Sequence, residues 1–263
     1  MQYPNHVVKV GEADAAIVKA LKKQLNLMLV PGDDENLRLD PQDPNFGPKM
    51  KRAVKLFQAR HVDNAGRPLK QDGEVGSLTW EALFGAQTVT ASENASGLLA
   101  EVLKVAAAEE AKKVREQPRN SNRGPQVDLY LRSVGLDPGY SWCCAFVYYC
   151  FEEAAKKLRR ANPMVRTGGC LKHWQDAPKK GAARIAAAQA FNNPALLRAG
   201  MIFIMDHGKG LGHTGLIESV SGGLLTTIEG NTDASLTREG GGVYRLVRKV
   251  ADINKGYIDY SGT

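Results

Sequence analysis

Apolar residues recur at helical spacing in the first third of the chain. Two stretches place them three or four positions apart: Ile17, Leu21, Leu25 and Met28, then Met50, Ala53, Val54 and Phe57. This spacing predicts one apolar face on each of two helices. A third, shorter helix is expected over residues 77–84, after a turn with Gly73 and Gly76 and with Ser77 as its N-cap. The pattern therefore predicts a small three-helix N-terminal domain.

The pattern changes after residue 86. Residues 86–97 are small and polar and show no periodicity, which is typical of a linker. Helices are then predicted over 98–116, 127–134 and 143–158, a helical insertion rich in Ala and Lys over 160–198, and strands over 200–205, 214–220, 224–229 and 243–250. Helices followed by an antiparallel set of strands predict an α+β fold. We expect a domain over 1–86, a linker over 87–97 and a second domain over 98–263.

Composition and charge exclude several classes of protein. The 263 residues are 43% apolar and 24% charged, as in a globular protein. The apolar stretches fall short of the roughly 20 residues of a membrane span, and residues 1–11 lack the apolar block of a secretory signal. We therefore expect synthesis in the cytoplasm without a signal peptide, and no stable membrane insertion.

The net charge is +7, and most of it lies after residue 90. A basic second half suits an anionic polymer, although a generic solubility charge explains it equally well. A nucleic-acid partner is not expected, because no basic stripe with interleaved aromatic residues is present.

The four cysteines suggest reactive rather than structural thiols. Three of them fall within eight residues, at 143, 144 and 150, and the fourth is Cys170. That spacing suits neither a disulfide framework nor a zinc site, and it favours a reducing compartment of synthesis. Cys143 is predicted in the first turn of a helix capped by Ser141, on the apolar face, where the helix dipole favours a thiolate. Cys144 remains a rival nucleophile, and Cys150 and Cys170 are expected to belong to the core.

A thiol nucleophile needs a base, and His213 is the strongest candidate. It stands between Gly212 and Gly215 at the start of an apolar strand, whereas the other four histidines lie elsewhere: His6, His61, His173 and His207. Glu229 and Asn231 close the next predicted strand. Two positions apart on an extended chain they share one face, so either could orient the imidazole. The same residues, with Gly230 between them, would also suit a plain hairpin turn.

Residues 12–85 resemble the three-helix type of peptidoglycan-binding domain. The resemblance rests on Ala53-Val54-Lys55-x-Phe57-Gln58 and on Asp72-Gly73-x-Val75-Gly76-x-x-Thr79-Trp80-x-x-Leu83. Most of these residues are expected to be structural, with Trp80 and Leu83 closing the core against Phe57. The acidic loop at 33–43 lacks the alternating oxygen ligands and central glycine of an EF-hand, so calcium is not expected there.

Residues 97–250 resemble the CHAP family of cysteine- and histidine-dependent amidohydrolases and peptidases. The matching segments are Trp142-Cys143-x-Ala145-Phe146-Val147, Ala199-Gly200-Met201-Ile202, Gly212-His213-x-Gly215 and Ile228-Glu229-Gly230-Asn231. The resemblance implies a papain-like fold with Cys143 as nucleophile, His213 as general base, and Glu229 and Asn231 as orienting or polarising groups. It implies no metal or organic cofactor. Met201 departs from the family, which often has Asp after this glycine.

These features together predict a hydrolase that cleaves an amide or peptide bond of bacterial peptidoglycan, such as a phage endolysin. A wall-degrading toxin delivered by a secretion apparatus would have the same architecture, and an immunity protein would then be a second partner. A third alternative is a wall-binding protein whose papain-like domain is not catalytic. The sequence does not select the bond that is cut.

Overall fold

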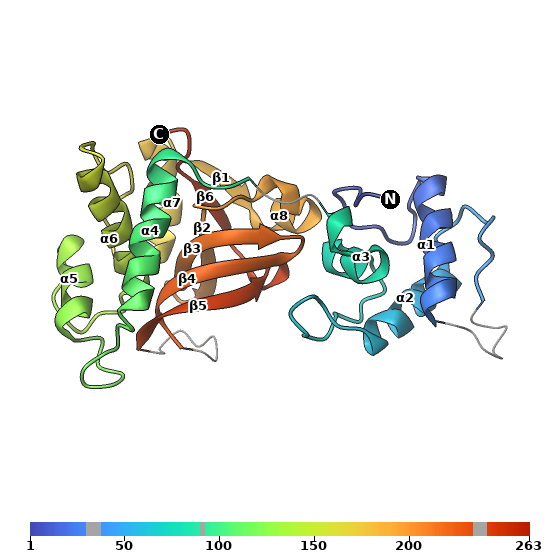
Figure 1. The fold of residues 1–263 in the computed structure, drawn as a ribbon, viewed down its shortest axis with the longest axis horizontal. Helices are drawn as coiled ribbons and strands as arrows, with labels where there is room; N and C mark the ends of the chain where they lie inside the picture. The colour runs from blue at the N-terminus through green and yellow to red at the C-terminus, as the bar shows by residue number, and fades with distance from the viewer. Residues whose placement is uncertain (30–37, 90–92, 234–240) are drawn as a thin grey trace. The chain divides into compact units, whose positions relative to one another are not determined.

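The computed structural model describes residues 1–29, 38–89, 93–233 and 241–263 (Figure 1). The chain forms two compact units, one containing Met1–Ala91 and the other most of Ser92–Thr263. Part of the acidic loop considered for calcium, residues 33–37, lies outside the described residues. The same holds for residues 90–92 of the predicted linker.

The first unit contains the three predicted helices. They are α1 (Ala15–Leu29), α2 (Pro48–Arg60) and α3 (Ser77–Phe84), followed by a short 3₁₀ turn, η1 (Ala86–Thr88). Their apolar faces form one buried cluster, in which Trp80 and Leu83 lie with Phe57 as expected. In the last turn of α1 the chain buries Leu29, whereas Met28 is exposed. Leu29 follows Leu25 by four positions and so stays on the same side of the helix.

The turn before α3 requires glycine at one of its two glycine positions. Gly73 has φ +76°, and a Cβ there would lie 2.7 Å from Cγ of Lys51. Gln58 holds this turn, because it accepts a hydrogen bond from the Gly73 amide and donates one to the Glu74 carbonyl. Gly76 has φ −84°, which any residue can adopt, and it occupies the N-cap position. The prediction of Ser77 as N-cap was wrong, because Ser77 is the first helical residue, is buried and makes no capping bond.

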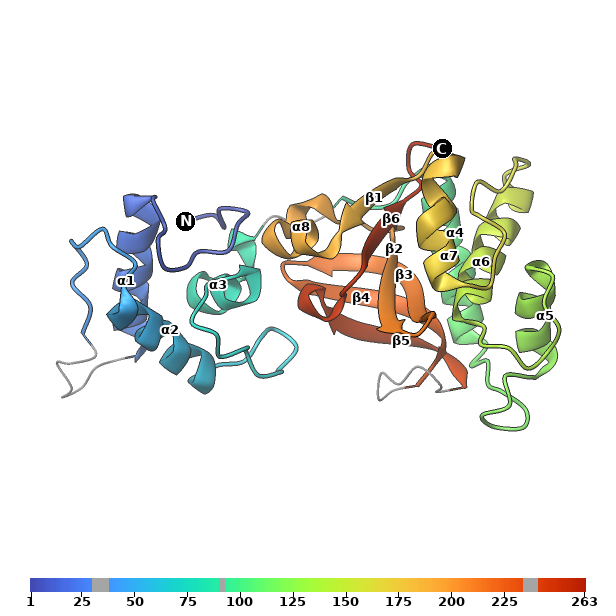
Figure 2. The same cartoon turned by 180° about the vertical axis from the view of Figure 1, so that it is seen from behind.

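The second unit is an α+β structure, as predicted from the sequence (Figures 1 and 2). Its helices are α4 (Gly97–Ala111), α5 (Pro125–Ser133), α6 (Cys143–Lys157), α7 (Cys170–Asp176) and α8 (Ala187–Asn192), with 3₁₀ turns η2 (Ala177–Lys180), η3 (Pro194–Leu196) and η4 (Val250–Asp252). Its strands are β1 (Ala183–Ala186), β2 (Ile202–Gly208), β3 (Leu211–Ser221), β4 (Leu224–Thr232), β5 (Gly242–Lys249) and β6 (Gly256–Asp259). They form one antiparallel sheet in the order β1-β6-β2-β3-β4-β5.

A buried apolar cluster lies on each face of this sheet, and successive side chains of a strand enter the two clusters alternately. Ile202 and Ile204 of β2 enter the cluster formed with α4, α5 and α6, whereas Phe203 between them enters a second cluster. On β6, Ile258 and Tyr257 divide between the two clusters in the same way. Figures 1 and 2 show α4, α5 and α6 together at one side of the sheet. Helix α6 packs there against α4, α5 and β4.

Two parts of this unit differ from the prediction. Helix α4 ends at Ala111 rather than near residue 116, and Lys113 turns the chain with φ +54°. The freed backbone then pairs with the start of β5, since the Glu116 amide donates to the Gly241 carbonyl and Val243 to Val114. The segment 160–198 is not purely helical, because Ala183–Ala186 forms an edge strand against β6. That strand has no apolar alternation in sequence, and its pairing partner defines it.

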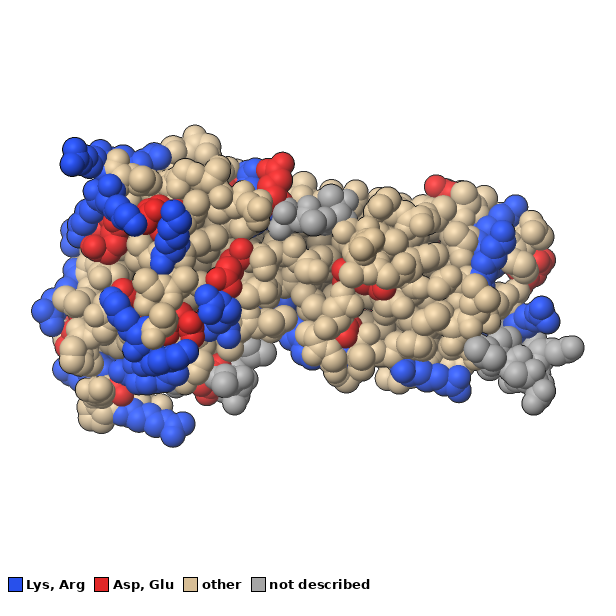
Figure 3. Space-filling model, viewed as in Figure 1, with Lys and Arg blue, Asp and Glu red and all other residues tan. Residues whose placement is uncertain are grey.

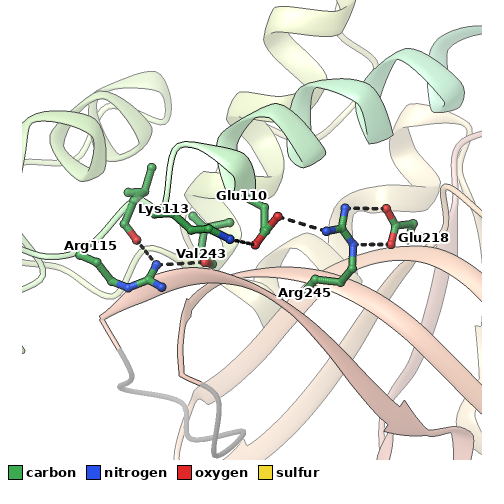
Figure 4. Close-up of polar contacts among 7 residues, drawn as sticks. Glu110, Lys113, Arg115, Glu218, Val243 and Arg245 are labelled. Carbon is green, nitrogen blue, oxygen red and sulfur yellow. Dashed lines mark hydrogen bonds and ion pairs between the residues drawn. The ribbon is translucent and has the colours of Figure 1, made fainter.

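A charged network joins the end of α4 to the sheet (Figure 4). Arg245 of β5 makes two hydrogen bonds to Glu218 of β3, of 2.7 and 2.9 Å, and a third of 3.1 Å to Glu110 of α4. Lys113 binds Glu110 at 3.0 Å, and Arg115 donates to the carbonyls of Val114 and Val243. These contacts fix the C-terminal end of α4 against the strands.

The positive charge of the second unit is largely balanced locally. Lys and Arg side chains gather over α4, α5 and α6, but Asp and Glu lie among them (Figure 3). Along α4 and just after its end, for example, Lys104, Lys112 and Lys113 each pair with a glutamate three positions earlier. Such pairs make this side a solvated mixed surface. None of the helices within the described ranges is long and apolar enough to span a bilayer.

Candidate active site

The first turn of α6 carries the predicted nucleophile. Cys143 is the first residue of the helix and is 3% exposed. The N-cap is Trp142, not Ser141 as predicted, and Ser141 is exposed. Trp142 is anchored by its indole N–H, which donates to Glu116 Oε1 at 2.9 Å. The thiol therefore sits at a helix N-terminus, where backbone N–H groups point outward and favour negative charge.

The predicted base and its orienting carboxylate are in direct contact. His213 on β3 and Glu229 on β4 are joined by a hydrogen bond of 2.7 Å between Nε2 and Oε2, and both side chains are buried. Among the described residues Nδ1 of His213 has no hydrogen-bond partner. The imidazole and the Cys143 thiol are close enough to shift each other's pKa. Since Glu229 occupies Nε2, the nitrogen available to the thiol is Nδ1.

The buried charges of the site support one another. Burial raises the pKa of Glu229, but hydrogen bonds from Arg248 and His213 outweigh it and lower that pKa to about 2. Burial lowers the pKa of His213, whereas Cys143 and Glu229 raise it, with a net value of about 9. Contact with Cys170 and burial raise the pKa of the Cys143 thiol, and the interaction with His213 opposes this rise. The arrangement favours an imidazolium held by an ionised Glu229.

Two glycines of the quoted motifs make room for this arrangement. A Cβ at Gly215 would lie 2.6 Å from Cγ of Glu229 and 2.8 Å from the Phe203 ring. A Cβ at Gly230 would lie 2.7 Å from both Phe146 and Trp142 of the nucleophile helix segment. Contacts this short are not tolerated, so both positions need a residue without a side chain. Gly215 admits the Glu229 side chain, and Gly230 lets β4 approach the start of α6.

Arg248 on β5 is a site residue that the sequence reasoning missed. Its Nε and Nη2 each donate a 2.6 Å hydrogen bond to Glu229, and the guanidinium lies over the Phe203 ring at 5.4 Å. Thr227 adds a 2.5 Å bond from its hydroxyl to the same carboxylate. The sequence does hold a signal, because Arg248 shares strand parity with the buried Leu246 and therefore falls at an inward position.

Asn231 lies in the same region in a different conformation from the one expected. Its φ is +55°, and the pairing of β4 with β5 shifts register between Glu229 and Thr232. The argument that Glu229 and Asn231 share a face of an extended strand was therefore wrong. The alternative of a plain hairpin turn is also wrong, since the segment is inside β4. The Asn231 side chain is buried, and neither of its amide atoms has a hydrogen-bond partner among the described residues.

All four cysteines are buried and free. Cys144 is directed to the Thr167 carbonyl, to which its thiol donates at 3.3 Å, and Cys150 lies in the core cluster. Cys170 belongs to the same cluster, but its Sγ is 3.4 Å from Sγ of Cys143, a contact that the core prediction did not anticipate. Met201, where the CHAP family often has Asp, is buried in the second cluster.

Three of the other histidines have partners outside this site. His173 is buried and its Nε2 lies 2.9 Å from the Tyr260 hydroxyl, and burial lowers its pKa to about 3. His6 pairs with Glu12, and His61 stacks on Phe57 in the first unit. Within the part of the chain that the structure describes, no three His, Cys, Asp or Glu side chains are grouped as ligands for a metal ion.

Comparison with known families gives two matches. The sequence model of the CHAP domain matches residues 135–231, and that of a peptidoglycan binding domain matches residues 14–83. Cys143, His213, Glu229 and Asn231 fall within the first match, and Arg248 lies beyond its end. Comparisons with curated proteins and with solved structures gave no significant match. The chain therefore carries a peptidoglycan-binding domain and a CHAP domain, the architecture of a hydrolase that acts on peptidoglycan in the cell wall.

Proposed function

We propose that this protein is a cysteine-dependent amidase or endopeptidase of peptidoglycan, of the endolysin type. The observation that carries the proposal is that a thiol, an imidazole and a carboxylate lie next to one another in this order. Cys143 begins α6, and His213 lies close enough for the two groups to shift each other's pKa. Nε2 of His213 is hydrogen-bonded to Glu229. A thiol, an imidazole and an orienting carboxylate in this order are what acyl transfer requires.

In the proposed reaction Cys143 attacks the carbonyl carbon of an amide or peptide bond as a thiolate. The C–N bond breaks as imidazolium His213 protonates the departing amine, which leaves a thioester on Cys143. His213 then takes a proton from water, the hydroxide attacks the thioester, and the acid and the thiolate are released. Backbone N–H groups at the start of α6 supply donors for the oxyanion.

The other polar groups have supporting roles in this proposal. Glu229 holds the imidazole in one tautomer and stabilises its charged form, and Arg248 and Thr227 hold Glu229. Asn231 has a buried amide whose atoms lack a hydrogen-bond partner among the described residues, which suits a polarising contact with the substrate or the imidazole.

The peptidoglycan-binding domain, proposed here over 1–86, would raise the concentration of the catalytic domain, proposed over 98–263, at the polymer through a linker at 87–97. The endolysin and the delivered toxin share this chemistry and differ in delivery. The toxin alternative alone calls for an immunity protein.

The test is digestion of purified peptidoglycan by wild type and by Cys143→Ala, with mass spectrometry of the soluble products. Release of intact stem peptides would identify an amidase, and cut stems or cross-links an endopeptidase. Cys143→Ala should release nothing while still folding and binding the wall, and the neighbouring Cys144→Ser serves as the matched control. If folded wild type bound the wall but released no fragments, the hydrolase would be rejected in favour of the wall-binding alternative. If Cys144→Ser were inactive and Cys143→Ala active, the nucleophile would be Cys144 instead of Cys143.

A further inference from the structure

A second thiol lies against the proposed nucleophile. Sγ of Cys170, the first residue of α7, is 3.4 Å from Sγ of Cys143, the first residue of α6. Both side chains are buried and neither is in a disulfide. A disulfide bond is about 2.05 Å long, so the two sulfur atoms need to approach by only about 1.4 Å to bond.

The packing around Cys170 keeps it in this place. Helix α7 packs on β2, and a Cβ at Gly212 would lie 3.0 Å from Cβ of Cys170. The missing side chain of Gly212, the residue before His213, thus provides the space that Cys170 occupies. This glycine therefore lets Cys170 approach β3, the strand that carries His213.

The other two thiols are less suited to react with Cys143. Cys144 is adjacent in sequence and its sulfur is directed to the Thr167 carbonyl. Cys150 lies two helical turns along α6, within the core cluster. Cys170 is thus the thiol whose position matches that of a resolving cysteine, which must reach an oxidised neighbour quickly.

We propose that Cys143 and Cys170 form a reversible disulfide on exposure to peroxide, and that this bond switches the hydrolase off and protects its nucleophile. The switched activity is that of Cys143, so this part of the proposal rests on the proposed function. In the first step the Cys143 thiolate attacks hydrogen peroxide, the O–O bond breaks, and Cys143 sulfenic acid and hydroxide form. In the second step the Cys170 sulfur attacks the sulfenic sulfur. The S–S bond forms, the S–O bond breaks, and water leaves with the thiol proton.

Formation of the disulfide protects Cys143 from further oxidation. A sulfenic acid that lacks a resolving thiol proceeds to the sulfinic acid, which thiol reagents do not reduce. A dithiol such as dithiothreitol reduces the disulfide to two thiols and becomes a cyclic disulfide itself. Reversibility after prolonged oxidation is therefore the property that Cys170 confers.

The experiment compares the full chain with Cys170→Ser and with the matched control Cys144→Ser, which removes the other thiol beside the nucleophile. Each protein is treated with hydrogen peroxide for increasing times and divided. One portion has its free thiols blocked for peptide mapping, and unblocked portions are assayed before and after reduction with dithiothreitol. Peptide mass spectrometry identifies the linked cysteines, and release of soluble peptidoglycan fragments measures activity relative to each protein's own reduced state.

Wild type and Cys144→Ser should give a peptide linked through 143 and 170, lose nearly all activity, and regain it on reduction. Cys170→Ser should gain oxygen atoms on Cys143 and regain little. A link through Cys144, no link at all, or equal recovery in Cys170→Ser would overturn the proposal. The peptide map needs no activity, so an inactive reduced wild type would reject the proposed function while the disulfide was still tested.

Discussion

Arg248→Met is the change that tests most directly how the site is held together. The arginine makes two 2.6 Å hydrogen bonds to Glu229, and the side chains are 5% and 0% exposed. Methionine keeps most of the volume but removes the cation, which leaves the carboxylate buried with His213 and Thr227 as its partners.

The expected loss of folding stability is large, because Glu229 stays buried after Arg248 is removed. Removing one member of a buried ion pair typically costs about 3–5 kcal/mol. Arg245→Met is the matched control, since Arg245 lies on the same strand and binds Glu218 in the same two-bonded way, but is 41% exposed. Screening by solvent limits such a surface pair to about 1 kcal/mol or less.

Activity should change in a direction set by Glu229. In the wild type its pKa is about 2, so the carboxylate stays ionised throughout the working range. Without Arg248, burial, which raises this pKa, is opposed mainly by His213, and protonation of Glu229 moves to higher pH. A protonated Glu229 no longer stabilises the imidazolium, so the acid limb of kcat/KM should shift upward in Arg248→Met and not in Arg245→Met.

Chemical denaturation at neutral pH measures the stabilities, and release of peptidoglycan fragments across pH measures the profiles. The double variant Arg248→Met with Glu229→Gln should recover part of the lost stability, because it removes the unpaired buried charge. Equal losses in Arg248→Met and Arg245→Met would refute the argument from burial. An unmoved acid limb in a folded Arg248→Met would refute the role assigned to Glu229.

Two further predictions concern packing and buried titration. Gly230→Ala should destabilise the protein by about 1–3 kcal/mol and reduce activity, because the new Cβ would lie 2.7 Å from Phe146; Gly262→Ala, which has no atom within 4 Å of its added Cβ, should unfold as the wild type does. His173 has a pKa of about 3 in the folded chain against about 6.5 when exposed, so the stability of its neutral form is present above pH 6.5 and is lost as the pH falls toward 3. His173→Gln should flatten this acid decline in the free energy of unfolding, and an unchanged slope would contradict the assignment.

The sequence predicted the helices and long strands because their patterns are local. Periodic apolar residues defined α1, α2 and α6, and alternating or continuous apolar runs defined β2 to β5. The short strand β1 had no such pattern, since its strand character comes from pairing with β6. The end of α4 was misplaced for a related reason. Its last predicted residues are good helix formers, but they pair with residues 241–243, and tertiary pairing overrides propensity.

The site residues could be predicted where the local sequence pattern indicates their position on a helix or strand. A helix start at Cys143 and strand positions at His213 and Glu229 could be read from flanking residues. Arg248 could not be assigned to Glu229, because nothing in the sequence states that β4 and β5 are neighbours in that register. Cys170 was not predicted beside the site, because a buried cysteine looks like an ordinary core residue in the sequence. Its contact with the Cys143 sulfur joins residues 27 positions apart, which the sequence alone does not indicate. The backbone conformation predicted for Asn231 was wrong, since a shift in strand register has no clear signature in a single sequence.

The buried charged groups of the site can touch only because glycines at nearby positions leave room for them. A carboxylate can remain ionised at zero exposure only with several short hydrogen bonds, and Glu229 receives them from three side chains on three strands: His213, Thr227 and Arg248. Those strands can converge on one carboxylate only because Gly215 leaves room for it. Gly230 and Gly212 then bring α6 and α7 against the same strands. A Cβ at any of the three would separate groups that must touch. The spacing of small residues in the Gly-His-x-Gly and Glu-Gly-Asn segments is therefore a packing requirement of the charged site, as much as the charged residues are.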